Sequence, residues 1–301
     1  MSIDRTTIIK GPAKITFDSG TFFSEDDIRV DFITDYFDVQ TSAFGSLGSR
    51  VSQRRIEVTF TPKMWDTLTK LFPYATAQIG DVVFGGTDKP LVITPSNGAP
   101  LTLANAAVTQ LPGITLSHGK PILRAMKFTA LCANNSDASV AANWFSWGTP
   151  ASAVALTGFD LTKVPNTRYS LARNSVTYQS EDGFMIDFSL GLAPDVVDGE
   201  GTVNFRITSL QASLKFTPTG KTEANYATLL GWDGIAPGKD PAAYNSVITG
   251  AASGPVVTIA NTMVVGGGAN YGPDKNRAGE VELTSVRTVS SGALTALWTF
   301  A

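Results

Sequence analysis

The chain has 301 residues, of which 43% are apolar and 16% charged, so it can build the core of one large or two medium domains. Its 23 lysine and arginine residues nearly balance 26 aspartate and glutamate residues, which argues against the basic surface of a protein that recognises nucleic acid. A single cysteine, Cys132, and a single histidine, His118, exclude an internal disulfide and zinc sites built on several such ligands.

The amino end shows no targeting segment. Residues 1–10 lack the apolar core of a signal peptide, and no apolar run approaches the roughly 20 residues that a membrane-spanning helix needs. We therefore expect a cytoplasmic protein without a membrane partner. A charged fraction of 16% beside 28 glycines is low for a freely diffusing monomer, which indicates that partners cover much of the surface.

The first elements along the chain are predicted strands. Ile28, Val30 and Phe32 alternate with polar residues, as in a strand with one buried face. Residues 38–53 are rich in glycine and serine and are expected to form a polar loop. Residues 56–62 alternate again and stop at a proline.

A short helix is predicted after this strand. Thr61 can cap its first turn, Pro62 suits its first position, and Pro73 ends it. The apolar stripe of this helix consists of Trp65, Leu68, Leu71 and Phe72.

Self-similarity indicates that the chain contains a tandem duplication. The Phe-Thr-Pro of residues 60–62 recurs at residues 216–218, a separation of 156 residues (216 − 60 = 156), and residues 102–105 match residues 258–261 at the same separation. Three weaker matches pair residues 15–17 with 176–178, Arg124 with Arg277, and Trp144 with Trp298. We expect a first domain over residues 1–150, a linker over 151–171 and a second domain over 172–301.

The second copy repeats the pattern of the first. Residues 184–190 alternate as a strand, and residues 194–201 form a short acidic loop. In residues 202–212 the apolar phase slips at Thr208 and Ser209, which predicts a bulge or a turn into the next strand. A short helix is then expected between Thr222 and Gly231, with its inward face formed by Tyr226, Leu229 and Leu230.

A strand leading into Phe-Thr-Pro, a short amphipathic helix and a polar loop between two strands, present twice, resembles the tail tube proteins of long-tailed bacteriophages. The resemblance implies a mainly β fold: two tandem β-sandwich domains, each with a short flanking helix. It also implies that three chains form a ring of six domains, that rings stack into a tube in the virion tail after assembly in the host cytoplasm, and that other tail proteins bind its ends. DNA would pass through the lumen without specific binding, and no cofactor, catalytic residue or metal site is implied.

The loops at residues 38–53 and 194–201 are the candidate contacts between successive rings, because the corresponding loop of the family mediates stacking. Their proposed contact residues are Phe44, Leu47, Arg50, Arg54, Arg55, Asp195, Asp198 and Glu200. The basic end of the first loop would complement the acidic second loop. Hairpin loops without partners remain the alternative.

Two other functions are weighed against this one. Four tryptophans could form sugar platforms in a carbohydrate-binding or adhesin-like pair of domains: Trp144, Trp147, Trp232 and Trp298. The acidic residues 25–27 and 181–182 could supply paired carboxylates or a calcium site, although solvated turns are the expected structure. His118 lies in a predicted turn, and no motif supports an enzyme.

Overall fold

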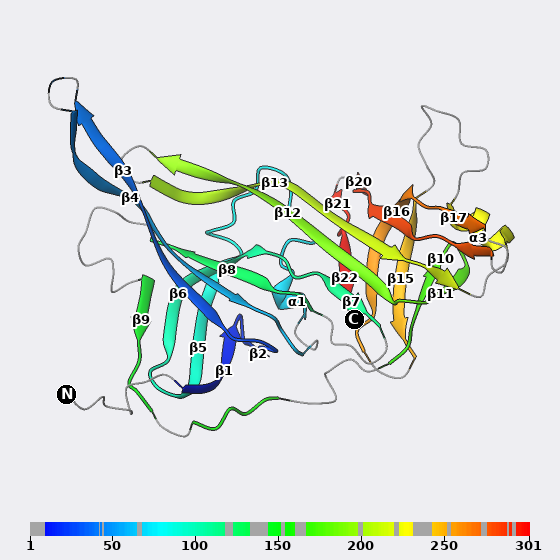
Figure 1. Ribbon diagram of the computed structural model, residues 1–301, viewed down its shortest axis with the longest axis horizontal. Helices are drawn as coiled ribbons and strands as arrows, with labels where there is room; N and C mark the ends of the chain where they lie inside the picture. The colour runs from blue at the N-terminus through cyan, green and yellow to red at the C-terminus, as the bar shows by residue number, and fades with distance from the viewer. Residues whose placement is uncertain are drawn as a thin grey trace.

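The computed structural model describes residues 10–41, 43, 45–64, 68–117, 123–132, 144–151, 154–159, 167–197, 201–219, 223–230, 243–251, 254–271, 276–287, 289–290 and 293–301. Figure 1 shows an elongated molecule in which the two halves of the chain lie side by side. The mainly β class predicted from the alternation is confirmed, with two large antiparallel sheets. We call the first half, from β1 to β9, module 1, and the second, from β10 to β22, module 2.

The sheet of module 1 places its edge strands far from one another. Its order is β2 (Gly20–Phe23), β1 (Lys10–Phe17), β5 (Lys89–Asn97), β6 (Leu101–Gln110), β8 (Met126–Leu131), β4 (Gly45–Phe60) and β3 (Arg29–Thr41), with β9 (Phe145–Trp147) also on β6. The rings of Phe17 on β1 and Phe128 on β8 are 4.6 Å apart although two strands separate them in this order. The sheet therefore folds over on itself and encloses a core, as in a β-sandwich.

The sheet of module 2 repeats this order. It runs through β14 (Pro218–Thr219), β11 (Val176–Ser180), β10 (Tyr169–Arg173), β15 (Tyr244–Gly250), β16 (Val257–Gly266), β19 (Val281–Ser285), β13 (Gly201–Phe216), β12 (Phe184–Val197) and β7 (Ile114–Leu116), with β22 (Trp298–Phe300) also on β16. From β11 to β12 each strand occupies the place of its counterpart in module 1. Two small hairpins, β17 (Ala269–Tyr271) with β18 (Asn276–Ala278) and β20 (Val289–Ser290) with β21 (Ala293–Leu294), complete the described strands.

The duplication extends to irregularities of the strands. The hairpin β3–β4 shifts register after Asp35 and again after Val39, and the hairpin β12–β13 shifts register after Gly191 and Asp195, at the separation of 156 residues found in the sequence (191 − 35 = 156). The first shift in β13 skips Thr208, so the phase slip predicted there is a bulge rather than a turn into another strand.

The weaker sequence matches are out of register. The turn residues Asp18 and Asn174, both with positive φ, follow β1 and β10 and identify these two strands as equivalent. Ile15 therefore corresponds to Leu171 and not to Val176. Likewise Leu103 pairs with Phe145 as Ile259 pairs with Trp298, which makes Phe145 the counterpart of Trp298. Alternation alone cannot distinguish neighbouring strands of a hairpin, because both carry the same period.

The match of Arg124 with Arg277 is also displaced. Phe60 pairs with Met126 and Phe216 pairs with Val281, so the chain separation at this strand is 155 residues (281 − 126 = 155). Arg124 therefore corresponds to Gly279. Leu171, placed in the linker by the sequence, is a fully buried residue of β10, so the linker ends before Tyr169.

Both helices are present and short. α1 (Leu68–Leu71) begins after Thr61 and Pro62, because Pro62 instead forms a bridge with Ser24 and cannot open a helix there. Leu68, Leu71 and Phe72 are buried as predicted, whereas Trp65 lies outside the described residues. α3 (Glu223–Leu230) buries Leu229, with Tyr226 and Leu230 partly buried; Thr222 and Gly231 lie outside the described residues.

The two predicted loops are mostly strand. Residues 38–41 belong to β3 and residues 45–53 to β4, and the second loop is divided between β12 and β13 in the same way. The small glycine and serine residues led to the prediction of a loop. A hairpin is held by main-chain hydrogen bonds between its strands, and these do not depend on bulky side chains. Figure 1 shows β3–β4 projecting from one end of the molecule, whereas β12–β13 crosses towards module 1.

Candidate functional site

Module 1 contributes a strand to the sheet of module 2. β7 pairs with the outer edge of β12 in an antiparallel register that joins Leu116 to Phe184, Thr115 to Met185 and Ile114 to Ile186. Without β7, the edge of β12 would expose a row of unpaired amide and carbonyl groups. The contact between the modules thus begins as main-chain hydrogen bonding.

A loop of module 1 makes a second contact, along the outer side of β13. The Gly80 amide donates to the carbonyl of Ile207 at 2.8 Å, and the Ile207 amide donates to the carbonyl of Asp81 at 2.9 Å. The Asn204 side chain accepts from the amide of Phe84 at 2.9 Å and donates to its carbonyl at 2.8 Å. Both strands of the β12–β13 hairpin are therefore held by module 1.

An aromatic cluster completes the junction. Phe72, which follows α1, lies 4.6 Å from the ring of Phe188, 4.8 Å from Phe300 and 6.4 Å from Trp298. Burying such a ring contributes about 1.5–3 kcal/mol. We call β7, Phe72 and residues 80–84 the docking surface of module 1, and β12, Phe188, Trp298 and Phe300 the receiving surface of module 2.

Module 1 has a receiving surface of its own, and it is open. The strand registers make Phe32 the counterpart of Phe188, Phe145 that of Trp298 and Trp147 that of Phe300. Phe32 and Phe145 meet edge to face at 5.6 Å, as Phe188 and Trp298 do at 4.9 Å. Phe32 and Trp147 are 52% and 50% exposed, whereas Phe188 is 7% exposed.

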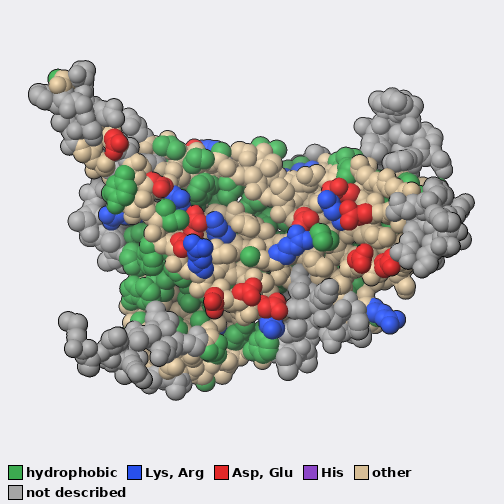
Figure 2. All heavy atoms as spheres, viewed as in Figure 1, with side chains coloured by type: hydrophobic (Ala, Val, Ile, Leu, Met, Phe, Trp, Pro, Cys, Tyr) green, Lys and Arg blue, Asp and Glu red, His purple; other side chains and the backbone are tan. Residues whose placement is uncertain are grey.

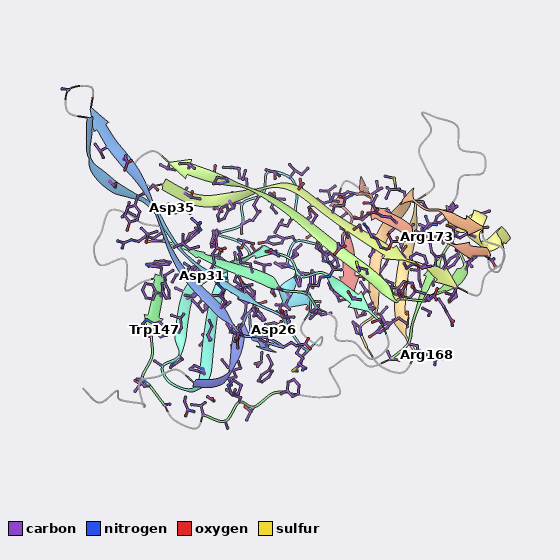
Figure 3. All side chains as sticks on the ribbon, viewed as in Figure 1. Asp26, Asp31, Asp35, Trp147, Arg168 and Arg173 are labelled. Atoms are coloured by element: carbon purple, nitrogen blue, oxygen red, sulfur yellow. The ribbon has the colours of Figure 1, made fainter. Side chains whose placement is uncertain are left out.

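The position of Phe32 corrects the sequence prediction. It belongs to the apolar phase of its strand, yet apart from its contact with Phe145 it is half exposed. Figure 2 shows hydrophobic side chains gathered at this end of the molecule, below the projecting hairpin, and Figure 3 labels Trp147 on β9 at the same end. A cluster of large exposed apolar side chains marks a binding or assembly surface.

The open receiving surface borders a groove of about 930 Å³. Its lining includes Phe32, Val30, Trp147, Glu25, Asp26 and Asp27. The counterpart groove of module 2 measures about 580 Å³ and is lined by Glu181, Asp182 and Phe184 together with Leu116 and Ser117 of module 1. The two grooves are thus the same feature, partly filled by the other module in one case and open in the other.

The acidic residues of the two grooves, which the sequence offered as paired carboxylates or a calcium site, lie at the protein surface. Glu25, Asp26 and Asp27 are exposed, and Asp26 accepts a hydrogen bond from the Thr61 hydroxyl at 3.2 Å. No group of three or more potential metal ligands occurs in the part of the chain that the structure describes. His118 and Trp232 lie outside that part.

The basic candidates for contacts between rings are partly engaged within the hairpin β3–β4. Arg55 forms ion pairs with Asp35 and, at 3.1 Å, with Glu57, which also binds Lys127 at 2.8 Å. Although burial alone would raise it, hydrogen bonds from Lys127 and Arg55 lower the pKa of Glu57. Although burial alone would lower it, bonds to Asp35 and Glu57 raise the pKa of Arg55. The Arg54 side chain is exposed.

The remaining candidates lie near the hairpin tips. Asp195 forms an ion pair with Arg206 across β12–β13 at 2.8 Å. Leu47 and Arg50 lie on β4, where the structure describes the backbone. Phe44, Asp198 and Glu200 lie outside the described residues. Among the described candidates, Arg55 and Asp195 therefore each form an ion pair within their own hairpin.

Sequence reasoning missed the docking and receiving surfaces. Phe32 continues the apolar alternation of Ile28 and Val30, so the sequence carries no signal that its ring is half exposed. No family model matches the chain, and no curated protein matches its sequence. No described helix is both long and apolar enough to cross a membrane.

Proposed function

We propose that the chain is a structural subunit that associates head to tail into rings, and that the rings stack into a tube like those of long-tailed bacteriophages. The observation that carries the proposal is that a receiving surface filled within the chain at module 2 recurs, open, at module 1. Module 1 uses its docking surface within the chain, and the hairpin β17–β18 of module 2 connects β16 to β19 as the segment with β7 connects β6 to β8.

The junction between the modules is heterologous, because two different surfaces meet. Repeating such a contact from chain to chain produces a ring when the rotation closes and a filament when it does not. The resemblance to tail tube proteins favours closure with six modules, hence three chains. A closed ring also removes the open strand edges that each chain carries on its own.

The tube, its place in a virion and the passage of DNA rest on that resemblance. The slight excess of acidic over basic residues suits a lumen through which a phosphate backbone must slide. Stacking between rings would use the projecting hairpin β3–β4, which lies clear of the rest of the chain in Figure 1. Other tail proteins would bind the first and last rings.

Substitution of Phe32 by glutamate tests the proposal. Since Phe32 is half exposed, Phe32→Glu should leave the fold of one chain intact while placing a charge in the receiving surface. Sedimentation at increasing concentration should show oligomers for the natural chain and for Ile79→Glu, a control at a 73% exposed apolar residue outside the receiving surface. Phe32→Glu should sediment as a monomer; unchanged oligomers would contradict the proposal.

The groove favours one alternative, a carbohydrate-binding module. A half-exposed Trp147 beside exposed carboxylates is a pattern that sugar sites use, and the groove is large enough for a small glycan. The filling of the counterpart surface by Phe72 speaks against this reading. A glycan ligand should change tryptophan fluorescence in the natural chain and not in Trp147→Ala, without any change of oligomeric state.

A further inference from the structure

The hairpin β17–β18 is the counterpart of the segment that docks module 1 onto module 2. Ile114 of β7 forms a bridge with Leu123, and Ala269 of β17 pairs with Ala278, so both ends of the hairpin recur 155 residues later (269 − 114 = 155). Both hairpins also connect the same two neighbouring strands, β6 to β8 and β16 to β19. Module 2 therefore carries, in β17, the counterpart of the strand β7 with which module 1 docks.

β17 presents an open edge at the far end of the molecule. In the described part of the chain it pairs with β18 alone, and its first residue, Ala269, is exposed. The hairpin is held in place from within: the Gly279 amide donates to the carbonyl of Gly268 at 2.7 Å, and the Tyr226 hydroxyl of α3 donates to the same carbonyl. Figure 1 shows β17 beside α3 at this end.

β3 presents the matching edge at the opposite end. It is the last strand of its sheet and pairs with β4 alone among the described strands. The register of the hairpins makes Ile28, Arg29 and Val30 the counterparts of Phe184, Met185 and Ile186, to which β7 is bound. The exposed Phe32 and the open groove lie along the same strand.

We propose that β17 of one chain pairs antiparallel with β3 of the next, in the register that β7 makes on β12. This places Tyr271 opposite Ile28, Asn270 opposite Arg29 and Ala269 opposite Val30. The occupant of the open surface is a second copy of this chain, since the junction within the chain already shows how β12 of module 2 receives a docking strand. The inference rests on the proposed function and specifies its chain-to-chain contact.

The two junctions are not identical: Asp27 stands where Gly183 has a φ of +90°, and one ion pair differs. Arg124 forms a 2.7 Å ion pair with Asp187 between the modules, and the counterpart positions are Gly279 and Asp31, which cannot form it. Both partners of that pair are well exposed, so its contribution is small. The strand pairing and the aromatic receiving surface are the parts that recur between chains.

Cysteine cross-linking between two different chains tests the register. In a Cys132→Ser background, one preparation carries Arg29→Cys and another carries Asn270→Cys. Oxidation of the mixture should give a covalent dimer containing one chain of each kind, and neither preparation alone should give it. Thr115→Cys with Met185→Cys in one chain is the positive control, because these residues are direct partners in the structure.

A control out of register uses Ile33→Cys in place of Arg29→Cys. Ile33 lies four residues further along β3, about 13 Å away at the rise of a strand. It should give at least tenfold less dimer with Asn270→Cys. Equal yields for the two mixtures would overturn the register.

Sedimentation of the reduced samples distinguishes a failure of the β17–β3 pairing from a failure of head-to-tail assembly. If the chains associate but Arg29→Cys and Asn270→Cys give no dimer above the control, the strand pairing is wrong and head-to-tail assembly by another contact survives. If the chains stay monomeric at every concentration and give no dimer, both the pairing and the proposed function are overturned.

Discussion

At the scale of single residues, the two modules differ in their cores at Arg173. It is the counterpart of Phe17 and only 3% exposed. Its guanidinium donates to the carbonyl of Thr262 at 3.1 Å and to that of Leu229 at 3.4 Å, and lies 5.0 Å from the ring centre of Tyr244. Burial lowers the pKa of Arg173. The side chain thus links β10, β16 and the end of α3.

Replacement of Arg173 by alanine should destabilise module 2. The change leaves a cavity and removes the donors of two buried carbonyls, so we expect the free energy of unfolding to fall by about 2–4 kcal/mol. Urea unfolding followed by circular dichroism measures it, with the exposed Arg168→Ala as the matched control. A loss no larger than that of the control would show that Arg173 does not hold these elements together.

Two buried tyrosines offer a second contrast. Burial raises the pKa of both Tyr74 and Tyr169 to about 12. The Tyr74 hydroxyl donates to the carbonyl of Val108 at 2.5 Å, whereas that of Tyr169 is buried without a hydrogen-bond partner among the described atoms.

Phenylalanine substitutions should therefore act in opposite directions. Tyr74→Phe leaves a carbonyl without its donor and should cost about 1 kcal/mol, while Tyr169→Phe removes an unsatisfied hydroxyl and should be neutral or stabilising. Thermal unfolding of the two variants decides the matter. A larger loss for Tyr169→Phe than for Tyr74→Phe would contradict these assignments.

At the scale of elements, alternation and the repeated Phe-Thr-Pro were enough to predict strands, two short helices and an irregularity at Thr208 and Ser209, with a bulge and a turn as the alternatives. They were not enough to align β1 with β10 or to find the long hairpins. Periodicity identifies the face of a strand, but the partner and register depend on contacts far apart in sequence, such as the pairing of Ile114 with Ile186.

The junction between the modules requires glycine at position 183, whereas the counterpart position holds Asp27. Gly183 has a φ of +90°, and an added Cβ would lie 2.6 Å from both the carbonyl oxygen of Leu116 and the Cβ of Ser117. Gly183→Ala should therefore strain the docking of β7 on β12 by about 1–3 kcal/mol.

Hydrogen exchange reports this effect locally. Amides of residues 114–116 should exchange faster in Gly183→Ala than in the natural chain, whereas Asp27→Ala should leave them unchanged. Unchanged protection in both variants would mean that β7 does not depend on this close approach.

At the scale of the whole molecule, the low charged fraction predicted that partners cover part of the surface, but it did not show which part a single chain leaves exposed. Phe32 and Phe188 occupy the same place in their strands, and only the fold shows that one is covered by Phe72 and the other exposed. The sequence could not reveal this because Phe32 and Phe188 are the same residue type at the same strand position. The difference is that, within the described part of one chain, a module docks on module 2 and none docks on module 1. Each duplicated chain thus contains one complete junction between modules, and it carries an open receiving surface at one end and a docking strand with an open edge at the other.

Electron microscopy of the purified chain at high concentration, combined with the mass of any particles, tests head-to-tail assembly most directly. Head-to-tail assembly predicts closed rings of three chains, single or stacked into tubes, without any added ligand. Two-fold symmetric dimers in which like surfaces meet, or a chain that stays monomeric at every concentration, would contradict it.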